Sequence, residues 1–219
     1  MSERLTIGIQ GGPGSFNEEA LHDYAERHSL TEGEDYDVAY MHTTEDVLKA
    51  LKKRRIDQGI FALHNAAGGI VDESVDAMGQ YNYETVEKMR IQISHTLMVP
   101  NGAELDSETV LITHPQVLSQ CEKTLYQRYP KLEKTSGDGP EIDHALVAQR
   151  MAEGKSVTAG GVVFDSQKIA TMGSINLAKM YGHTIVDQNM QDRGDDNPTS
   201  FMVVKRRKPF MRRMADKLH

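Results

Sequence analysis

Short apolar runs alternate with amphipathic segments along most of this chain. Leu5–Ile9 has the composition of a buried strand, and a glycine-rich turn and a segment with helical spacing follow it. Thr43 or Thr44 can cap the next helix, in which Val47 and Leu51 share an apolar face. The predicted strands are 5–9, 58–63, 91–100, 110–113, 157–164, 184–186 and 200–204, and the predicted helices are about 17–27, 43–54, 115–126, 143–152 and 175–181.

This alternation of strands and helices predicts an α/β fold with mixed, mostly parallel sheets. Two polar stretches, 101–109 and 191–198, are typical of loops that separate lobes. We expect the first lobe to contain about residues 1–100 and 190–204, because the last strand returns to it, and the second lobe about 101–189. Ligands of such folds bind at the carboxyl ends of strands, so the cleft between the lobes is the expected site.

Charge is distributed unevenly along the 219 residues. The net charge is −7, but the segment 205–219 contains seven Lys or Arg and one Asp, so this tail carries +6 and residues 1–204 carry −13. An acidic body without Trp argues against nucleic-acid binding. The basic C-terminal tail is either a solvated terminus or a contact with the acidic body or a partner subunit.

The single cysteine, Cys121, excludes an internal disulfide, and we expect it to be a small core residue. No apolar run reaches the ~18 residues that a membrane span needs, and the N-terminus has no apolar signal region. We therefore expect a cytoplasmic protein that makes no membrane contact.

The segment Gly11–Glu19 links the first strand to the first helix. Ser15 and Glu18 have the spacing of a capping box, and the glycines would let the backbone approach a ligand. A helix N-terminus at this place favours an anion. The residues match neither the dinucleotide-binding nor the Walker A pattern, so the segment is either a tight turn or a binding loop.

Three further junctions place polar side chains next to predicted strands. The Asn65 amide offers contacts to a carboxylate or hydroxyl, or only stabilises its own turn. His114 precedes Pro115 at a helix start, where its ring either contacts a ligand or bonds the backbone. Thr199 and Ser200 provide two hydroxyls where the last strand begins. The nine histidines show no metal-binding spacing, so no metal site is expected.

The order of these motifs resembles that of the prephenate dehydratase catalytic domain over nearly the whole chain. The most specific match is Thr113–Cys121, which follows the family pattern S-H-P-Q-x-L-x-Q-C with one conservative change. The other matches, in family order, are Gly14–Phe16 to G-[TS]-F, His64–Gly69 to part of E-N-[ST]-x-x-G, Ile93–Leu97 to I-x-H-x-L, Ala170–Gly182 to A-x-x-G-S-x-x-A-x-x-Y-G, and Asn197–Phe201 to N-x-T-R-F.

The resemblance implies two lobes built like a type 2 periplasmic binding protein, a homodimer or higher oligomer, and no metal or organic cofactor. It implies a carbon–oxygen lyase that converts prephenate, a small anion, to phenylpyruvate by loss of water and carbon dioxide. The family's Thr assists departure of hydroxide, a catalytic role that carries over to Thr199. The amides of Gly14 and Ser15 and the side chain of Asn65 would hold a carboxylate. The remaining expected substrate contacts are Phe16, His114, Gln116, Ser200 and Phe201.

Several departures from the family pattern fall at the expected site. The family Arg after the Thr is Ser200 here, which removes a cation that could clamp a carboxylate. The Glu before Asn65 is His64, and the hydroxyl after Asn65 is lost at Ala66. His64 is either a new catalytic acid or base or a packed replacement. The segment 135–144 also lacks the family's Ser/Thr-Thr pattern.

These departures leave three hypotheses. The first is prephenate dehydration itself. The second is a diverged enzyme of specialised metabolism that acts on another cyclic anion, such as a cyclohexadienyl or seven-membered-ring acid or its thioester. The third is a non-catalytic module that binds a small acid. Only fifteen residues follow Val204, so the family's regulatory ACT domain is not expected.

Overall fold

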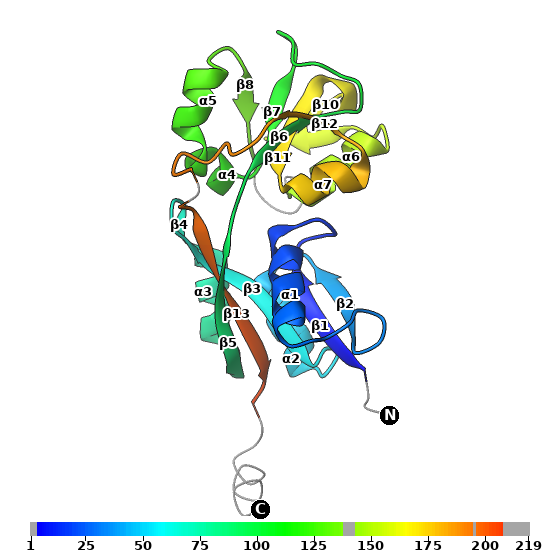
Figure 1. Cartoon of the computed structure of the whole chain (residues 1–219), viewed down its shortest axis with the longest axis vertical. Coiled ribbons are helices and arrows are strands. Elements are labelled where there is room, and N and C mark those ends of the chain that lie inside the picture. The colour runs from blue at the N-terminus through cyan, green and yellow to red at the C-terminus, as the bar shows by residue number, and fades with distance from the viewer. Residues whose placement is uncertain (1–3, 138–142, 195, 208–219) are drawn as a thin grey trace, which may run out of the picture.

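The computed structural model describes residues 4–137, 143–194 and 196–207, and these form two α/β lobes joined by two crossing segments (Figure 1). The crossing segments are bonded to each other. Ile93 N–H donates to the Asn197 carbonyl at 3.1 Å, and Asn197 N–H donates to Gln92 Oε1 at 3.2 Å. The predicted two-lobed α/β fold is confirmed.

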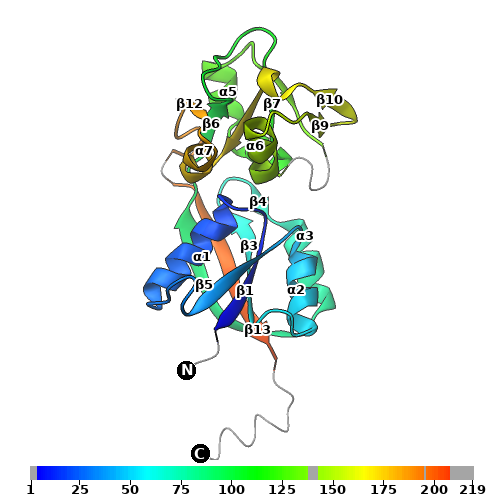
Figure 2. The same cartoon turned by 90° about the vertical axis from the view of Figure 1, so that its right-hand side faces the viewer.

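The first lobe contains a sheet with the strand order β2-β1-β3-β13-β5, to which the short β4 adds beside β3. Helix α1 covers one face of this sheet, and α2 and α3 cover the other (Figure 2). The bounds are β1 (Leu5–Gln10), α1 (Phe16–Arg27), β2 (Tyr36–Met41), α2 (Thr44–Lys52), β3 (Gln58–Asn65), β4 (Gly69–Ile70), α3 (Asp72–Gln80), β5 (Tyr83–Gln92) and β13 (Pro198–Arg206).

Side chains of β13 alternate between the two helix layers, as strand geometry requires. Phe201 and Val203 are buried in the cluster that includes α1, whereas Met202 and Val204 are buried in the cluster that includes α2 and α3. The alternation therefore decides which residues at the start of β13 face the same side as Phe201.

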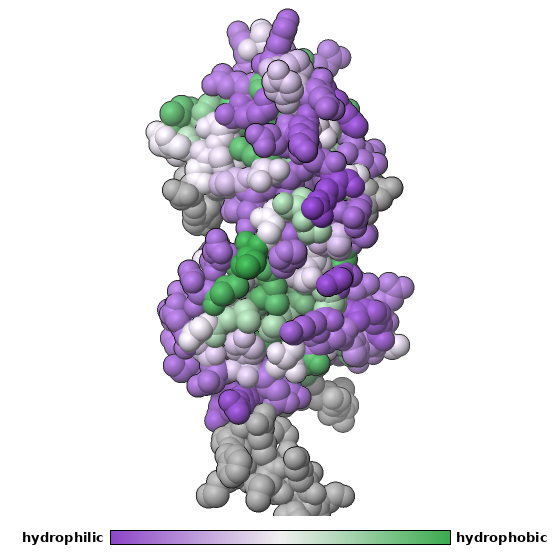
Figure 3. All heavy atoms as spheres, turned by 90° about the vertical axis from the view of Figure 1, so that its left-hand side faces the viewer, coloured by the Kyte–Doolittle hydropathy of each residue, from purple (hydrophilic) through white to green (hydrophobic). Residues whose placement is uncertain are grey.

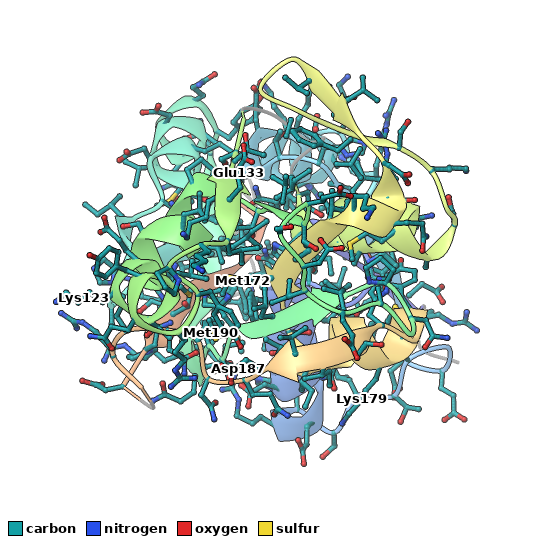
Figure 4. The ribbon with its side chains drawn as sticks, turned by 90° about the horizontal axis from the view of Figure 1, so that it is seen from above. Lys123, Glu133, Met172, Lys179, Asp187 and Met190 are labelled. Carbon is teal, nitrogen blue, oxygen red and sulfur yellow. The ribbon has the colours of Figure 1, made fainter. Side chains whose placement is uncertain are left out.

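The second lobe contains a sheet with the strand order β12-β6-β11-β7-β8. Met172 and Met190 lie inside this lobe when it is viewed from above, and Lys123 and Lys179 lie at its periphery (Figure 4). The bounds are β6 (Thr96–Val99), β7 (Val110–Ile112), α4 (Pro115–Gln120), α5 (Glu122–Arg128), β8 (Glu133–Thr135), α6 (His144–Ala152), β9 (Val157–Ala159), β10 (Val162–Phe164), a 3-10 turn (Ser166–Lys168), β11 (Ile169–Gly173), α7 (Ile175–Tyr181) and β12 (Thr184–Asp187).

Two expectations about the sheets and lobes were wrong. The sheets are mixed without a parallel majority, because β13 inserts antiparallel between β3 and β5, and β6 lies antiparallel between β11 and β12. The first lobe ends before residue 100, because β6 pairs within the second sheet.

Several strand bounds also differ from the sequence expectation. The expected strand 91–100 is divided between the end of β5 and β6 in the second sheet. The run 157–164 is a hairpin and not one strand, because Gly160 and Gly161 adopt φ values of +56° and +79° and turn the chain. At the C-terminal side, β13 includes Lys205 and Arg206, so the strand continues two residues into the expected tail, and Lys205 lies 3.5 Å from a carboxylate oxygen of Glu84. Residues 208–219 lie outside the described part.

The two lobes meet at a narrow waist, and apolar side chains gather on the first lobe just below it (Figure 3). Exposed apolar residues of this lobe include Ile70 on β4 and Val75 on α3. Among the described residues, no helix is long and apolar enough to cross a bilayer. Cys121 is fully buried, as expected for a core residue.

Candidate functional site

A cavity of about 300 Å³ lies between the lobes and receives side chains from both. The first lobe supplies the starts of α1 and β13 and the end of β3, and the second lobe supplies the starts of α4 and α6. Seven of the residues expected at the site line this cavity: Ser15, Phe16, Asn65, His114, Gln116, Thr199 and Phe201.

Thr199 and Asn65 are cross-strand neighbours on β13 and β3, and their side chains are bonded in the cavity wall. Asn65 Oδ1 accepts the backbone N–H groups of Ala67 at 2.9 Å and Gly68 at 2.7 Å. The amide is thereby oriented so that Asn65 Nδ2 donates to Thr199 Oγ1 at 2.8 Å. Because this oxygen already accepts a hydrogen bond, and no described residue accepts its proton, the Thr199 hydroxyl can donate to a ligand.

His114 is the N-cap of α4, and its Nδ1 accepts Gln116 N–H at 3.2 Å. This bond leaves the proton of the neutral ring on Nε2. Burial, together with the positive field of His144, lowers the pKa of His114 and favours that neutral form. His114 therefore has one of the two roles that the sequence offered, because its ring bonds the backbone as a helix cap, and the ring also lines the cavity.

A buried amide network fixes a second histidine at the point where the chain crosses between lobes. Gln120 Oε1 accepts from His95 Nε2 at 2.8 Å and from Asn197 Nδ2 at 3.1 Å. Burial lowers the pKa of His95 to about 4, so the ring is neutral near pH 7 and its Nδ1 has no partner among the described residues. The His95 ring also meets the edge of Phe16, with ring centroids 5.2 Å apart.

Gly14 does not have the role that was expected for it. Its N–H donates to Glu18 Oε2 at 2.6 Å and is unavailable to a substrate carboxylate, because the capping carboxylate reaches Gly14 and not Ser15. Gly14 instead allows the lobes to approach. Its φ is +81°, and a Cβ there would lie 2.6 Å from Leu177 Cδ1 of α7. Ser174 Oγ also donates to the Gly14 carbonyl at 3.0 Å.

The side chains of Ser15 and Asn65 also form hydrogen bonds within the protein. Ser15 Oγ accepts Glu18 N–H at 3.3 Å as the cap of α1, and the Ser15 N–H donates to the Gly12 carbonyl. The Asn65 amide serves its own turn and Thr199. The Ser15 hydroxyl, like that of Thr199, keeps its own proton, and Asn65 Nδ2 has a second N–H without a described acceptor. These groups can donate to a carboxylate, but none of them carries a positive charge.

His64 and Ser200 do not line the cavity, which corrects their expected substrate and catalytic contacts. They are directly paired across β3 and β13, and strand alternation places them opposite Asn65 and Thr199. Arg90 of β5 pairs with Ser200 from the other side. The two main family departures therefore belong to one cross-strand row on the side of α2 and α3.

The charged groups that line the cavity are acidic. Its described lining includes the carboxylates of Asp72, Glu73 and Asp143 but no Lys or Arg. Glu73 is held by Thr44 N–H at 2.9 Å and by Gln10 Nε2 at 3.1 Å. Within this lining, only histidine side chains are able to carry a positive charge. The described residues also contain no group of three or more His, Cys, Asp or Glu suited to hold a metal ion.

Sequence reasoning missed His95, Gln120 and His144 as cavity residues. His95 and Gln120 stand within the quoted family motifs, so their motif positions were a usable signal. His144 had no such signal, because it falls where the family pattern was judged to be lost. Only the packing of α6 against the cleft reveals its position.

The geometry defines a two-lobed α/β protein with a polar cleft, the arrangement of periplasmic-binding-protein-like folds. A family profile described as "Prephenate dehydratase" matches residues 7–209, and the chain belongs to that family. The family match is therefore consistent with the two-lobed fold and with the cleft between the lobes.

The relatives differ from this chain in length and share a modest part of its sequence. An "Arogenate dehydratase/prephenate dehydratase 2, chloroplastic" of Arabidopsis thaliana is 25% identical over 207 residues, which cover 93% of this chain and 47% of the relative. The chain thus spans about half the length of the curated relatives that it matches.

Solved structures show the same fold. Prephenate dehydratase from Arthrobacter aurescens, in complex with L-Phe, has a TM-score of 0.71 at 19% identity, with 94% of this chain and 61% of that chain covered. An ABC transporter protein from Parabacteroides distasonis has a TM-score of 0.50 at 10% identity, with 98% and 70% covered.

Proposed function

We propose that this protein is a carbon–oxygen lyase that converts prephenate to phenylpyruvate. The observation that carries the proposal is the Asn65–Thr199 hydrogen bond in the cleft wall. It leaves the Thr199 hydroxyl proton as a donor toward the cavity. The family membership supplies the reaction class, and the geometry supports Thr199 as the catalytic residue.

The reaction does not require the protein to form a covalent bond with the substrate. The ring carboxylate leaves as carbon dioxide, and its electron pair enters the ring while the ring C–O bond breaks. The departing hydroxide takes up one proton and leaves as water, and the ring becomes aromatic. A Thr hydroxyl is a very weak acid, so Thr199 stabilises the developing hydroxide by a positioned hydrogen bond, and solvent supplies the net proton.

Arogenate is a second candidate substrate, and the charge of the cavity favours it. Arogenate carries an ammonium group where prephenate has a keto group, so its net negative charge is smaller. The carboxylates of Asp72 and Glu73, with no Lys or Arg in the described lining, suit such a substrate better than a dianion. The name of the Arabidopsis relative includes both activities. No specific feature of the cleft favours the other cyclic acids or a non-catalytic role.

The test is to give the purified chain prephenate and arogenate separately and to measure phenylpyruvate and phenylalanine by mass spectrometry. Formation of either product, abolished in Thr199→Ala, supports the lyase. The ratio of the two kcat/KM values then identifies the preferred substrate. Turnover of neither substrate by a folded protein would reject the proposed function.

A further inference from the structure

We propose that His144 binds a carboxylate group of the substrate, as the positively charged partner that the cleft otherwise lacks. The inference rests on the proposed function, because it assumes an anionic ring acid in this cavity. His144 is the first residue of α6, and its imidazole lines the cavity opposite the Thr199 side. It lies in the segment where the family pattern has hydroxyl residues.

The imidazole of His144 is held by packing and by no described hydrogen bond. Its ring centroid lies 5.6 Å from that of Phe16, at an interplanar angle of 48°. On the second lobe it lies against Gly173 of β11, where a Cβ would come within 3.3 Å of His144 Cδ2. Its Nε2 is enclosed and has no partner among the described residues. The other ring nitrogen, Nδ1, is not enclosed and makes no described hydrogen bond, so it is the atom that a ligand in the cleft can reach.

The other two histidines of the cavity are less suited to carry a positive charge, because burial lowers the pKa of both rings. His95 donates its Nε2 proton to Gln120 and is fully enclosed. His114 uses Nδ1 to cap α4. Asp143, the neighbour of His144, uses Oδ1 to accept the N–H groups of Ala145 and Leu146 at 3.0 and 3.1 Å. This carboxylate therefore caps α6 and forms no hydrogen bond with the imidazole.

The groups around His144 determine how its charge responds to pH. His95 faces it from the crossing segment and His114 faces it from α4. Phe16 and Gly173 also contact the ring but carry no charge. Asp143 is the neighbouring acid at the start of α6. A bound carboxylate favours the imidazolium form, so substrate binding takes up a proton at this ring. Binding must then weaken as pH rises through the histidine range.

The experiment compares the wild-type protein with His144→Gln and His144→Thr at about pH 6 and about pH 8, the range in which histidine side chains in general change charge. Steady-state kinetics give kcat and KM for prephenate, and calorimetry gives the affinity for phenylpyruvate, which does not react. We expect either variant to raise KM about tenfold or more at the lower pH while kcat changes less than about threefold. The wild-type KM should rise with pH, and the variants should show a flat KM.

His183→Gln is the matched control. His183 belongs to the same lobe, its Nδ1 is also enclosed without a described partner, and its Nε2 lies 2.8 Å from the Ala148 carbonyl, outside the cavity. This variant should lower the melting temperature without changing KM or its pH dependence.

The outcomes separate this inference from the proposed function. A wild-type KM that is independent of pH and unchanged in both His144 variants would overturn the role of His144 and leave the lyase intact. Binding of phenylpyruvate that depends on pH and on His144, without turnover of prephenate or arogenate, would overturn the lyase and support His144. Neither turnover nor binding would overturn both.

Discussion

The two sides of the β3–β13 pair differ in a way that explains much of this molecule. On the cavity side, Asn65 and Thr199 match the family pattern, and each side chain has a defined partner. On the opposite side, His64 and Ser200 stand where the family pattern has Glu and Arg. Strand alternation thus places the residues that line the cavity and the residues that depart from the family pattern on opposite sides of the sheet.

This comparison changes the meaning of the missing Arg. A Glu and an Arg at the positions of His64 and Ser200 would be directly opposite one another, a placement that stabilises a sheet when the charges differ. Their joint replacement is therefore expected to remove one cross-strand charge pair. It removes no clamp from the described cavity lining, which explains how the scaffold can lose both charges and keep the Asn65–Thr199 pair intact.

Removing the Thr199 hydroxyl should have the largest effect. Thr199→Ala deletes the proposed donor to the leaving hydroxide. We expect kcat to fall about 10²–10⁴-fold while the melting temperature changes by no more than a few degrees. Thr199→Ser restores the hydroxyl and should recover most of the rate. Fixed-time assays of phenylpyruvate formation measure kcat. A Thr199→Ala variant with the wild-type kcat would contradict the catalytic role of Thr199.

Asn65→Ala should have the next largest effect, because it changes both the orientation of the Thr199 hydroxyl and the stability of the folded protein. The variant leaves the Ala67 and Gly68 N–H groups without their acceptor and releases Thr199. We expect a loss of about 1–3 kcal/mol in the free energy of unfolding and a fall in kcat smaller than that of Thr199→Ala. Denaturant melts and steady-state rates test both parts; unchanged stability would show that the turn does not need the amide.

These same residues show which features of the site the sequence can predict. Motif order and strand ends placed Asn65, Thr199 and His114 at the cleft correctly. Strand alternation predicts that Ser200 and Thr199 face opposite sides of the sheet. The family motif instead predicts a substrate contact at Ser200, because the family residue at that position is a charged Arg. The acceptor of the Gly14 N–H is set by the conformation of the Glu18 side chain, which sequence spacing alone does not determine.

Three of the missed strands, β2, β5 and β8, lie at the edges of their sheets. β2 and β5 form the two edges of the first sheet and carry polar residues at several positions, so neither has the apolar run of a central strand. The contact of His144 with Phe16 and Gly173 joins three elements from distant parts of the chain. Such a contact depends on tertiary packing, and no local pattern predicts it.

The pH dependence of stability should report the buried His95. Its pKa is about 4 in the folded protein and near 6.5 when unfolded, so the unfolded chain binds the extra proton between these values. Stability should therefore fall as pH decreases from about 6.5 to about 4, by up to about 1.4 kcal/mol per pH unit, and His95→Gln should reduce that slope. Urea melts at several pH values measure it. An identical slope in the variant would assign the acid sensitivity to other groups.

The smallest effect is expected on the opposite side of the sheet. Restoring the family pair with His64→Glu and Ser200→Arg together should change stability by only about 0.2–1 kcal/mol and leave kcat within about twofold. Each single variant and the double variant, compared by thermal melts and rates, give the coupling energy. A large gain or loss of kcat in the double variant would place this row in the active site after all.

The most direct test of the central claim is a double-mutant cycle on kcat for Thr199→Ala and Asn65→Ala with the preferred substrate. If Asn65 acts by orienting the Thr199 hydroxyl, then Asn65→Ala should slow the wild-type protein but add almost nothing to Thr199→Ala. If the two losses multiply, the residues act independently, and the hydrogen bond between them is not the basis of the activity.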